Sequence, residues 1–207
     1  MSVASANGTV TAKAISSRKA AKAAAILDAA EAVMIAQGAS FEISELAKAA
    51  GVSNGLAYHY FGSKDGLIEA VVERFYLRYS DVIDRRADPD IDWGVRERVR
   101  LEEAIAFLYA DPFAATVFST LSHSSATLCE IAHQRVMSAN AAHNIRSGQK
   151  RGQIALDIDA ELAGAAIAGA IRQTIATAMR MQPRPEPAKL AEQLWRLIAA
   201  AVGLDAD

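Results

Sequence analysis

The sequence has little cysteine, few aromatic side chains and almost no net charge. Its single cysteine, Cys129, excludes an intramolecular disulfide and any cysteine-based zinc site built from this chain alone, which fits a reducing compartment. Only 6% of the 207 residues are aromatic although 52% are hydrophobic, so the apolar mass comes mainly from Ala, Leu, Ile and Val, a mixture typical of packed helices. The net charge of -2 excludes a globally basic nucleic-acid binder, and any basic surface must be local.

Long hydrophobic runs are also missing. Residues 1–14 hold no apolar stretch of the kind that marks a secretory signal. The longest apolar run, residues 162–171, ends at Arg172, well short of the roughly 18 residues that a membrane span needs. We therefore expect a soluble cytoplasmic protein that has no membrane partner.

The N-terminal part of the chain predicts an arm followed by a helix. Residues 1–16 show no helical period, and we expect them to form a flexible basic arm. Apolar side chains then recur at the 3.6-residue period over residues 26–34. This pattern predicts a helix that begins at Ser16 or Ser17 and ends at Gly38.

Two short helices and a longer one follow. Residues 43–50 carry one apolar face, and Gly51 ends this helix after barely two turns. A second short helix runs from Ser53 to Phe61, and a longer one from Ser63 to about Asp81. Two short helices joined by a turn that contains glycine are typical of a helix-turn-helix, although spacing alone favours an ordinary pair of short helices in a bundle.

The rest of the sequence reads as helices, with breaks at residues 87–93, 111–112, 152–159 and 183–187. No strand pattern competes with this interpretation. We therefore predict an all-α protein, with a helix-turn-helix domain over residues 17–64 and a helical domain over residues 65–207.

Polar side chains on the second short helix suggest contacts with nucleic acid. A two-turn helix buries little surface, yet this one carries hydrogen-bonding groups suited to phosphates or base edges: Asn54, Tyr58, His59 and Tyr60. Ser53 and Lys64 stand at the starts of successive helices, where backbone N–H groups and the helix dipole favour a phosphate. Residues 1–64 also hold six Lys or Arg against four acidic residues.

The run Gly51-Val-Ser-Asn-Gly-Leu-Ala-Tyr-His-Tyr-Phe-Gly-Ser-Lys-Asp-Gly-Leu67 resembles the tetracycline-repressor (TetR) family of bacterial transcriptional regulators, and the likeness extends over residues 26–75. The resemblance implies a homodimer with an N-terminal DNA-binding domain and a C-terminal domain for a small effector and for dimerisation. It places Asn54, Gly55, Leu56 and His59 in the major groove, and Tyr58, Tyr60 and Lys64 on phosphates. The family's basic extension corresponds to Lys13, Arg18, Lys19 and Lys22.

Three positions depart from the family pattern. Glu42 replaces the usual threonine cap, and Ser40 is the alternative cap, which would move the start of that helix by two residues. Ser44 stands where a basic residue is common. Leu56 replaces a common threonine and is restricted to an apolar contact, such as one with a thymine methyl group. These changes concern which bases are read.

The resemblance therefore implies a ligand-responsive regulator, in most cases a repressor, that binds a palindromic operator in double-stranded DNA and is released by a small-molecule effector of unknown class. No cofactor is implied. The alternative is a helical small-molecule-binding protein or enzyme in which residues 40–64 are only scaffold and DNA is not bound. A further alternative keeps the DNA binding in an activator or chromosome-organising factor.

Other chemistry has little support in the sequence. Cys129, His123, His133 and His143 include no pair at helical ligand spacing, so we expect no metal site. No nucleophile elbow of the G-x-S-x-G type is present, and we expect no enzyme.

Two features of the C-terminal part each have two interpretations. The Ala- and Gly-rich helix over residues 160–179 permits close helix approach, either inside one subunit or across a two-fold axis with the helix over residues 190–201. The resemblance favours the second. Five aromatic or sulfur side chains fit a ligand cavity and core packing equally well: Phe107, Tyr109, Phe113, Phe118 and Met137.

Overall fold

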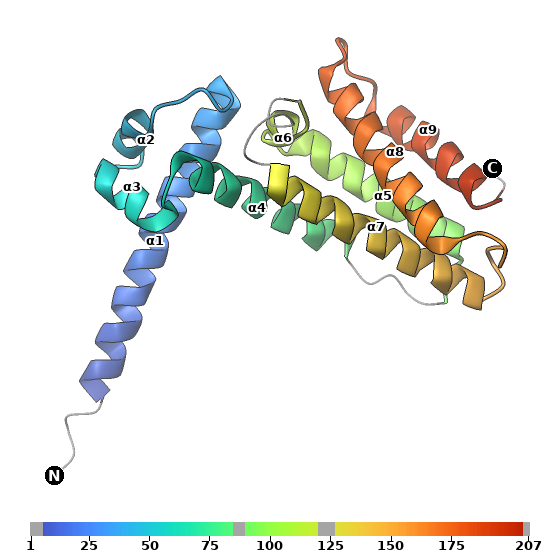
Figure 1. Cartoon of the computed structure of the whole chain (residues 1–207), viewed down its shortest axis with the longest axis horizontal. Coiled ribbons are helices and arrows are strands. Elements are labelled where there is room, and N and C mark those ends of the chain that lie inside the picture. The colour runs from blue at the N-terminus through green and yellow to red at the C-terminus, as the bar shows by residue number, and fades with distance from the viewer. Residues whose placement is uncertain (1–5, 85–89, 120–126, 205–207) are drawn as a thin grey trace. The chain divides into compact units, whose positions relative to one another are not determined.

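The computed structural model describes residues 6–84, 90–119 and 127–204, without the side chains of residues 6–18, 119 and 127–129. All regular secondary structure in these ranges is helical, as Figure 1 shows, which confirms the predicted all-α class. The chain divides into two compact units, residues 1–71 and residues 72–207.

The first unit begins with a helix that is longer than the sequence pattern suggested. Helix α1 spans Ala6–Gln37, so the expected start at Ser16 or Ser17 is wrong, and residues 6–16 are helical rather than an irregular arm. The segment contains no proline, so nothing in it breaks the helix, although Gly8 and the neighbouring β-branched residues are weak helix formers. The side chains of Lys13 and Arg18 lie outside the described part of the structure.

The C-terminal half of α1 packs on two short helices, α2 (Ile43–Ala49) and α3 (Asn54–Phe61). Ala47 of α2 is fully buried. Helix α2 begins after Glu42, whose side chain makes no capping hydrogen bond, so the alternative start at Ser40 is wrong. Gly51 turns the chain between the two helices with a φ of +66°, in the left-handed region that favours glycine.

Helix α4 (Lys64–Ile83) starts at a tight junction with α3. The Ser63 Oγ accepts a hydrogen bond of 3.0 Å from the Gly66 N–H. A Cβ at Gly66 would lie only 2.2 Å from the Phe61 carbonyl oxygen, so only glycine fits this position without a shift of the backbone. Helix α4 continues past Val71, where the first unit ends, into the second unit.

The second unit contains α5 (Trp93–Ala110), α6 (Ala114–Ser119), α7 (Thr127–Lys150), α8 (Ala160–Arg180) and α9 (Pro187–Ala201). Their ends confirm the predicted breaks at residues 111–112, 152–159 and 183–187, and α5 begins where the first break ends. Asp92 and Asp159 cap α5 and α8 by accepting backbone N–H bonds. Helix α8 packs along α7, α6 and α9, and α5 packs along α9 (Figure 1).

The small residues of α8 allow a close approach to α7 within the chain. A Cβ at Gly164 would lie 2.6 Å from the backbone nitrogen of Ala142, so the two helix backbones nearly touch there. Among the described helices, α8 is also long and apolar enough, by length and composition alone, to cross a membrane. Its opposite face remains exposed or open, with Leu162 72% exposed and nothing within 4 Å of a Cβ at Gly169.

Candidate nucleic-acid interface and ligand cavity

Helix α3 presents most of its polar side chains to solvent. Its N-terminus is capped by Ser53, whose Oγ accepts a hydrogen bond of 3.3 Å from the Leu56 N–H. Ala57 is the buried residue of α3, and the predicted contact residues around it fall into two groups. Asn54, Gly55, Tyr58 and His59 are exposed, whereas Leu56 and Tyr60 are half-buried.

The aromatic residues of α3 support one another at its C-terminal end. The ring of Tyr60 meets that of His59 edge-on with centroids 5.7 Å apart, and lies 6.2 Å from the ring of Phe61. These contacts hold Tyr60 by its ring. Nothing lies within 4 Å of a Cβ built on Gly55, so another molecule can approach the backbone of α3 there. The helix therefore offers an amide, an imidazole and two phenols on a surface with a bare backbone patch.

Lys64 is held more tightly than the sequence indicated. Its Nζ donates a hydrogen bond of 2.6 Å to the Phe41 carbonyl oxygen and lies 4.6 Å from the centroid of the Phe41 ring. An ammonium group has three donors, so two remain for another acceptor such as a phosphate. The sequence did not indicate the structural roles of Phe41 and Gly66. Gly66 could have been noticed, because glycine inside a helix lowers its stability and is therefore expected there only where packing requires it.

The second unit contains a cavity of about 420 Å³, a size typical of sites for small molecules. Its lining comes from all six helices that contribute to this unit, α4 to α9. Of the five aromatic or sulfur residues that the sequence offered as lining, Phe118 and Met137 line the cavity.

The other three are outside the lining. Phe107 and Phe113 pack against the ring of Phe75 in the core, at centroid distances of 6.1 and 6.0 Å. The Tyr109 hydroxyl donates a hydrogen bond of 2.8 Å to the Pro185 carbonyl oxygen.

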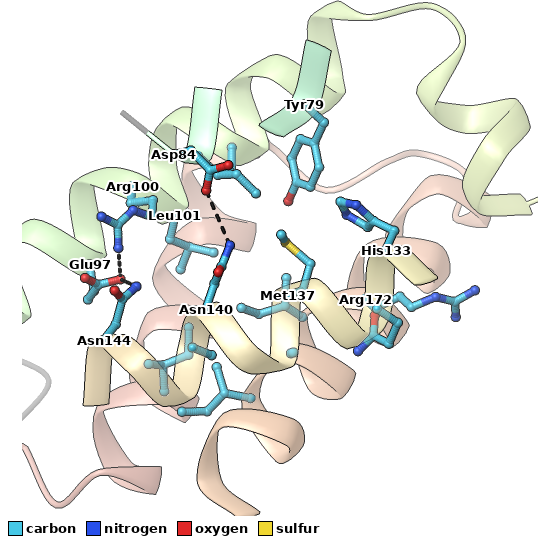
Figure 2. Close-up of a pocket in the computed structure, with 18 of the residues that line it drawn as sticks. Tyr79, Asp84, Glu97, Arg100, Leu101, His133, Met137, Asn140, Asn144 and Arg172 are labelled. Atoms are coloured by element: carbon cyan, nitrogen blue, oxygen red, sulfur yellow. Dashed lines mark hydrogen bonds and ion pairs between the residues drawn. The ribbon is translucent and has the colours of Figure 1, made fainter. Parts of the chain in front are cut away.

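Charged groups in the cavity wall are paired with one another. Glu97 forms ion pairs with Arg100 and Arg96 and accepts a hydrogen bond of 3.2 Å from the Asn144 amide, part of which Figure 2 shows. Arg172 pairs with Glu130.

Asp84 is the remaining carboxylate among the described residues of the lining. It is exposed and accepts a bond of 3.4 Å from the Asn140 amide (Figure 2). Most charged side chains of the described wall are therefore neutralised by ion pairs with other side chains of the protein.

Two uncharged polar groups face the interior of the cavity. Figure 2 shows the Tyr79 hydroxyl pointing into the space beside Met137, with His133 nearby. Burial raises the pKa of Tyr79 to about 12 and lowers the pKa of His133 to about 4, so both groups are neutral at pH 7. The His133 ring stacks on Tyr76 with centroids 3.9 Å apart.

Within the described ranges, no three His, Cys, Asp or Glu side chains lie close enough together to hold a metal ion. His123 and the side chain of Cys129, which belonged to the candidate set, lie outside those ranges.

Comparisons with known proteins agree with the three-helix unit. Residues 26–71 match the family model described as bacterial regulatory proteins, tetR family. A segment of 58 residues is 40% identical to the HTH-type transcriptional regulator BetI 1 of Chromohalobacter salexigens. This segment spans 28% of the present chain and 28% of that relative.

Solved structures share the fold over nearly the whole chain. The SmeT–triclosan complex matches with a TM-score of 0.73 and 20% identity, over 87% of this chain and 91% of that one. The regulator FadR from Bacillus subtilis in complex with stearoyl-CoA matches with a TM-score of 0.67 and 20% identity, over 86% and 98% of the two chains. At this identity the likeness establishes the arrangement of the helices and nothing about the ligand.

Proposed function

We propose that the chain, whose residues 26–71 carry the N-terminal domain of the tetR family of bacterial regulatory proteins, is a cytoplasmic transcriptional repressor. It binds a palindromic DNA operator as a homodimer, is released by a small molecule and catalyses no reaction. The observation that carries this proposal is the exposed polar face of α3 in a unit that matches the family model, joined by α4 to a unit with a cavity of about 420 Å³.

The exposed side chains of α3 divide between base edges and phosphates. Asn54 and His59 are exposed donors and acceptors suited to base edges, Gly55 lets the backbone approach, and Leu56 supplies an apolar contact. The phosphate contacts come from the hydroxyl groups of Ser53, Tyr58 and Tyr60 and from Lys64. Of the basic residues near the N-terminus, Lys19 and Lys22 are exposed on α1 and can add further phosphate contacts.

Dimerisation uses the exposed faces of α8 and α9. Leu162 on α8 and Leu197 on α9 are 72% and 46% exposed, although leucine is usually buried. Next to them, Ala166, Gly169 and Ala200 leave little side-chain bulk, so the same two helices of a second copy can approach closely. A four-helix bundle across a two-fold axis would bury these side chains.

Release follows from the geometry of a dimer on DNA. Two recognition helices must lie about one helical turn apart, roughly 34 Å, to enter successive major grooves. A ligand that binds better to a dimer with another spacing shifts the population away from DNA, by no more than its differential affinity for the two forms. Two proteins with this fold have been solved with small molecules, SmeT with triclosan and FadR from Bacillus subtilis with stearoyl-CoA, which supports a ligand in the cavity.

The test is a selection of random duplex DNA on the purified protein, with affinity for the enriched pool measured at two salt concentrations. We expect a palindrome whose affinity falls steeply as salt rises, because phosphate contacts release counterions. If neither specific nor non-specific duplex is retained at low salt, the alternative of a helical binder without DNA affinity replaces this proposal.

The same selection separates base readers from phosphate contacts. Asn54→Ala and His59→Ala should change the enriched sequence, because side chains at base edges carry specificity. Tyr60→Phe should weaken binding to every sequence alike and leave the enriched palindrome unchanged. If Asn54→Ala or His59→Ala selects the same palindrome as the wild type, the replaced residue does not contact base edges.

A further inference from the structure

We propose that the cavity of the second unit selects an uncharged polycyclic ligand with one hydroxyl or carbonyl group, which hydrogen-bonds to Tyr79 and His133. This inference deepens the proposed function, on which it rests for its regulatory meaning. It follows from three properties of the wall: paired charges, the neighbouring neutral side chains of Tyr79 and His133, and apolar surfaces.

The first property argues against a charged ligand. The cavity wall contains two guanidinium groups, and both already pair with carboxylates, Arg100 with Glu97 and Arg172 with Glu130. A ligand carboxylate would have to displace one of these built-in partners and leave it unpaired in a half-buried site, which is costly. No other lysine or arginine lines the cavity among the described residues.

A cationic ligand has only a weak counterpart. Asp84 is the one carboxylate of the described lining without a guanidinium partner. It is exposed to solvent and already accepts a hydrogen bond from Asn140, so water screens its charge. The described residues of the wall therefore offer no buried free charge of either sign to a ligand.

The second property places a polar group of the ligand. Tyr79 is only 7% exposed, and in the described structure neither its hydroxyl nor the His133 imidazole forms a hydrogen bond with another protein group. Both groups line the cavity, so a polar group of a ligand can replace water as their hydrogen-bond partner. A neutral phenol and a neutral imidazole can each donate and accept, so together they match a hydroxyl or a carbonyl.

The third property sets the remainder of the ligand. The lining contains aliphatic side chains, among them Leu101, Ile167 and Ile175, and the adaptable Met137. Trp93 and Tyr76 add flat aromatic surfaces. A rigid ring system fits this environment, because it buries apolar area with little loss of conformational entropy.

The test uses four probes that share one ring system: phenanthrene, 9-phenanthrol, phenanthrene-9-carboxylate and phenanthren-9-ylmethylamine. Binding to the full chain at pH 7 is followed by the fluorescence of each probe. We expect 9-phenanthrol to bind most tightly, at least about tenfold better than the carboxylate and the amine, and about fivefold to tenfold better than phenanthrene.

Two variants locate the hydrogen bond. Tyr79→Phe keeps the ring and should reduce the affinity for 9-phenanthrol to about that for phenanthrene, without changing the affinity for phenanthrene itself. Tyr109→Phe is the matched control, because its hydroxyl is bonded to Pro185 and lies outside the cavity lining. His133→Phe should act like Tyr79→Phe while its ring still stacks on Tyr76.

Several results would overturn the inference: tighter binding of the carboxylate or of the amine, binding of none of the probes, or equal loss of both neutral probes in Tyr79→Phe. Its failure is separable from failure of the proposed function, because DNA retention is measured on the same protein. If the carboxylate or the amine binds most tightly while operator DNA is retained, only the proposed ligand class is wrong. If 9-phenanthrol binds as expected but no duplex is retained, the cavity assignment holds and the regulator proposal fails.

Discussion

The Nζ of Lys64 donates a hydrogen bond to the Phe41 carbonyl oxygen and lies over the Phe41 ring, which ties the start of α4 to the segment before α2. The hydrogen bond measures 2.6 Å and the distance to the ring centroid 4.6 Å. The lysine therefore has a structural partner inside the first unit as well as the phosphate contact that we propose for it. These two roles predict different losses when the side chain is changed.

Lys64→Ala should weaken binding to operator and non-operator duplex alike, because it removes a phosphate contact that does not read sequence. The slope of log affinity against log salt concentration should become shallower by about 1. Affinity measured on one duplex over a range of salt concentrations checks this. Lys189→Ala, an exposed lysine on α9 in the other unit, should leave the slope unchanged.

The structural role gives a separate readout for the same variant. Loss of the Phe41 contact should lower the midpoint of thermal unfolding by a few degrees, since a hydrogen bond from a charged donor contributes about 1.5–3 kcal/mol. If Lys64→Ala unfolds earlier but keeps the wild-type salt slope, its ammonium serves only to hold Phe41, and the phosphate contact is wrong.

Gly66→Ala should destabilise the first unit, because the added Cβ would lie 2.2 Å from the Phe61 carbonyl oxygen and force α3 and α4 apart. We expect a loss of about 1–3 kcal/mol in the free energy of unfolding, typical of overpacking. Gly55→Ala is the matched control, since nothing lies within 4 Å of its Cβ and alanine favours a helix by about 1 kcal/mol. Chemical denaturation of both variants decides, and equal stability would show that the α3–α4 junction yields without cost.

Much of the fold could be predicted from the sequence, because many helix ends depend on interactions between residues that are close together in the chain. The helix start after Ser53 and the break before Asp159 rest on side chains that bond backbone groups two or three residues away. The start of α1 at Ala6 was missed because residues 6–16 carry no periodic apolar pattern. Lys64 and Phe41 lie 23 positions apart, so no local pattern reports their contact.

The cavity shows the same limit. Phe107, Phe118 and Met137 were equally good candidates for the lining in the sequence, yet only Phe118 and Met137 line the cavity. Helix packing decides which face of each helix turns toward the cavity, and the sequence alone does not show this. Tyr79 lies on the buried side of α4 together with Phe75 and Tyr76. Only the fold brings its hydroxyl beside His133, which lies 54 positions further along the chain.

The stability of the second unit should depend on pH through His133. Burial lowers its pKa from 6.5 to about 4, whereas the unfolded chain keeps the higher value. Between these values the unfolded state binds more protons, so the free energy of unfolding falls as pH decreases from about 6.5 to about 4. The full effect amounts to at most about 3 kcal/mol and is reduced by the solvent that reaches the ring.

Urea denaturation at a series of pH values between 7 and 4 checks this dependence. His133→Leu should flatten the curve in that interval and leave the contribution of the carboxylates, which is common to both proteins. Equal slopes for the two proteins would mean that the imidazole can be protonated in the folded state without cost, for instance by turning toward solvent.

Leu197→Asp should convert the proposed dimer into monomers. Leu197 is 46% exposed on α9, and at a two-fold interface the change places two carboxylates opposite each other in a surface that had been apolar. Since burial of a leucine contributes about 1.5–3 kcal/mol per copy, we expect the dimer to weaken at least tenfold. Operator affinity should fall with it, because each half-site alone provides half of the contacts.

Leu156→Asp is the matched control for Leu197→Asp. Leu156→Asp alters a leucine that is 83% exposed between α7 and α8, so it changes charge and apolar surface in the same way but outside the proposed interface. Sedimentation velocity at micromolar concentration should give monomers for Leu197→Asp and dimers for Leu156→Asp. If both variants remain dimers with wild-type operator affinity, the face formed by α8 and α9 is not the interface. A palindromic operator would then require two copies to associate through another surface. The distance between the two recognition helices, and with it the explanation of ligand release, would depend on that surface instead.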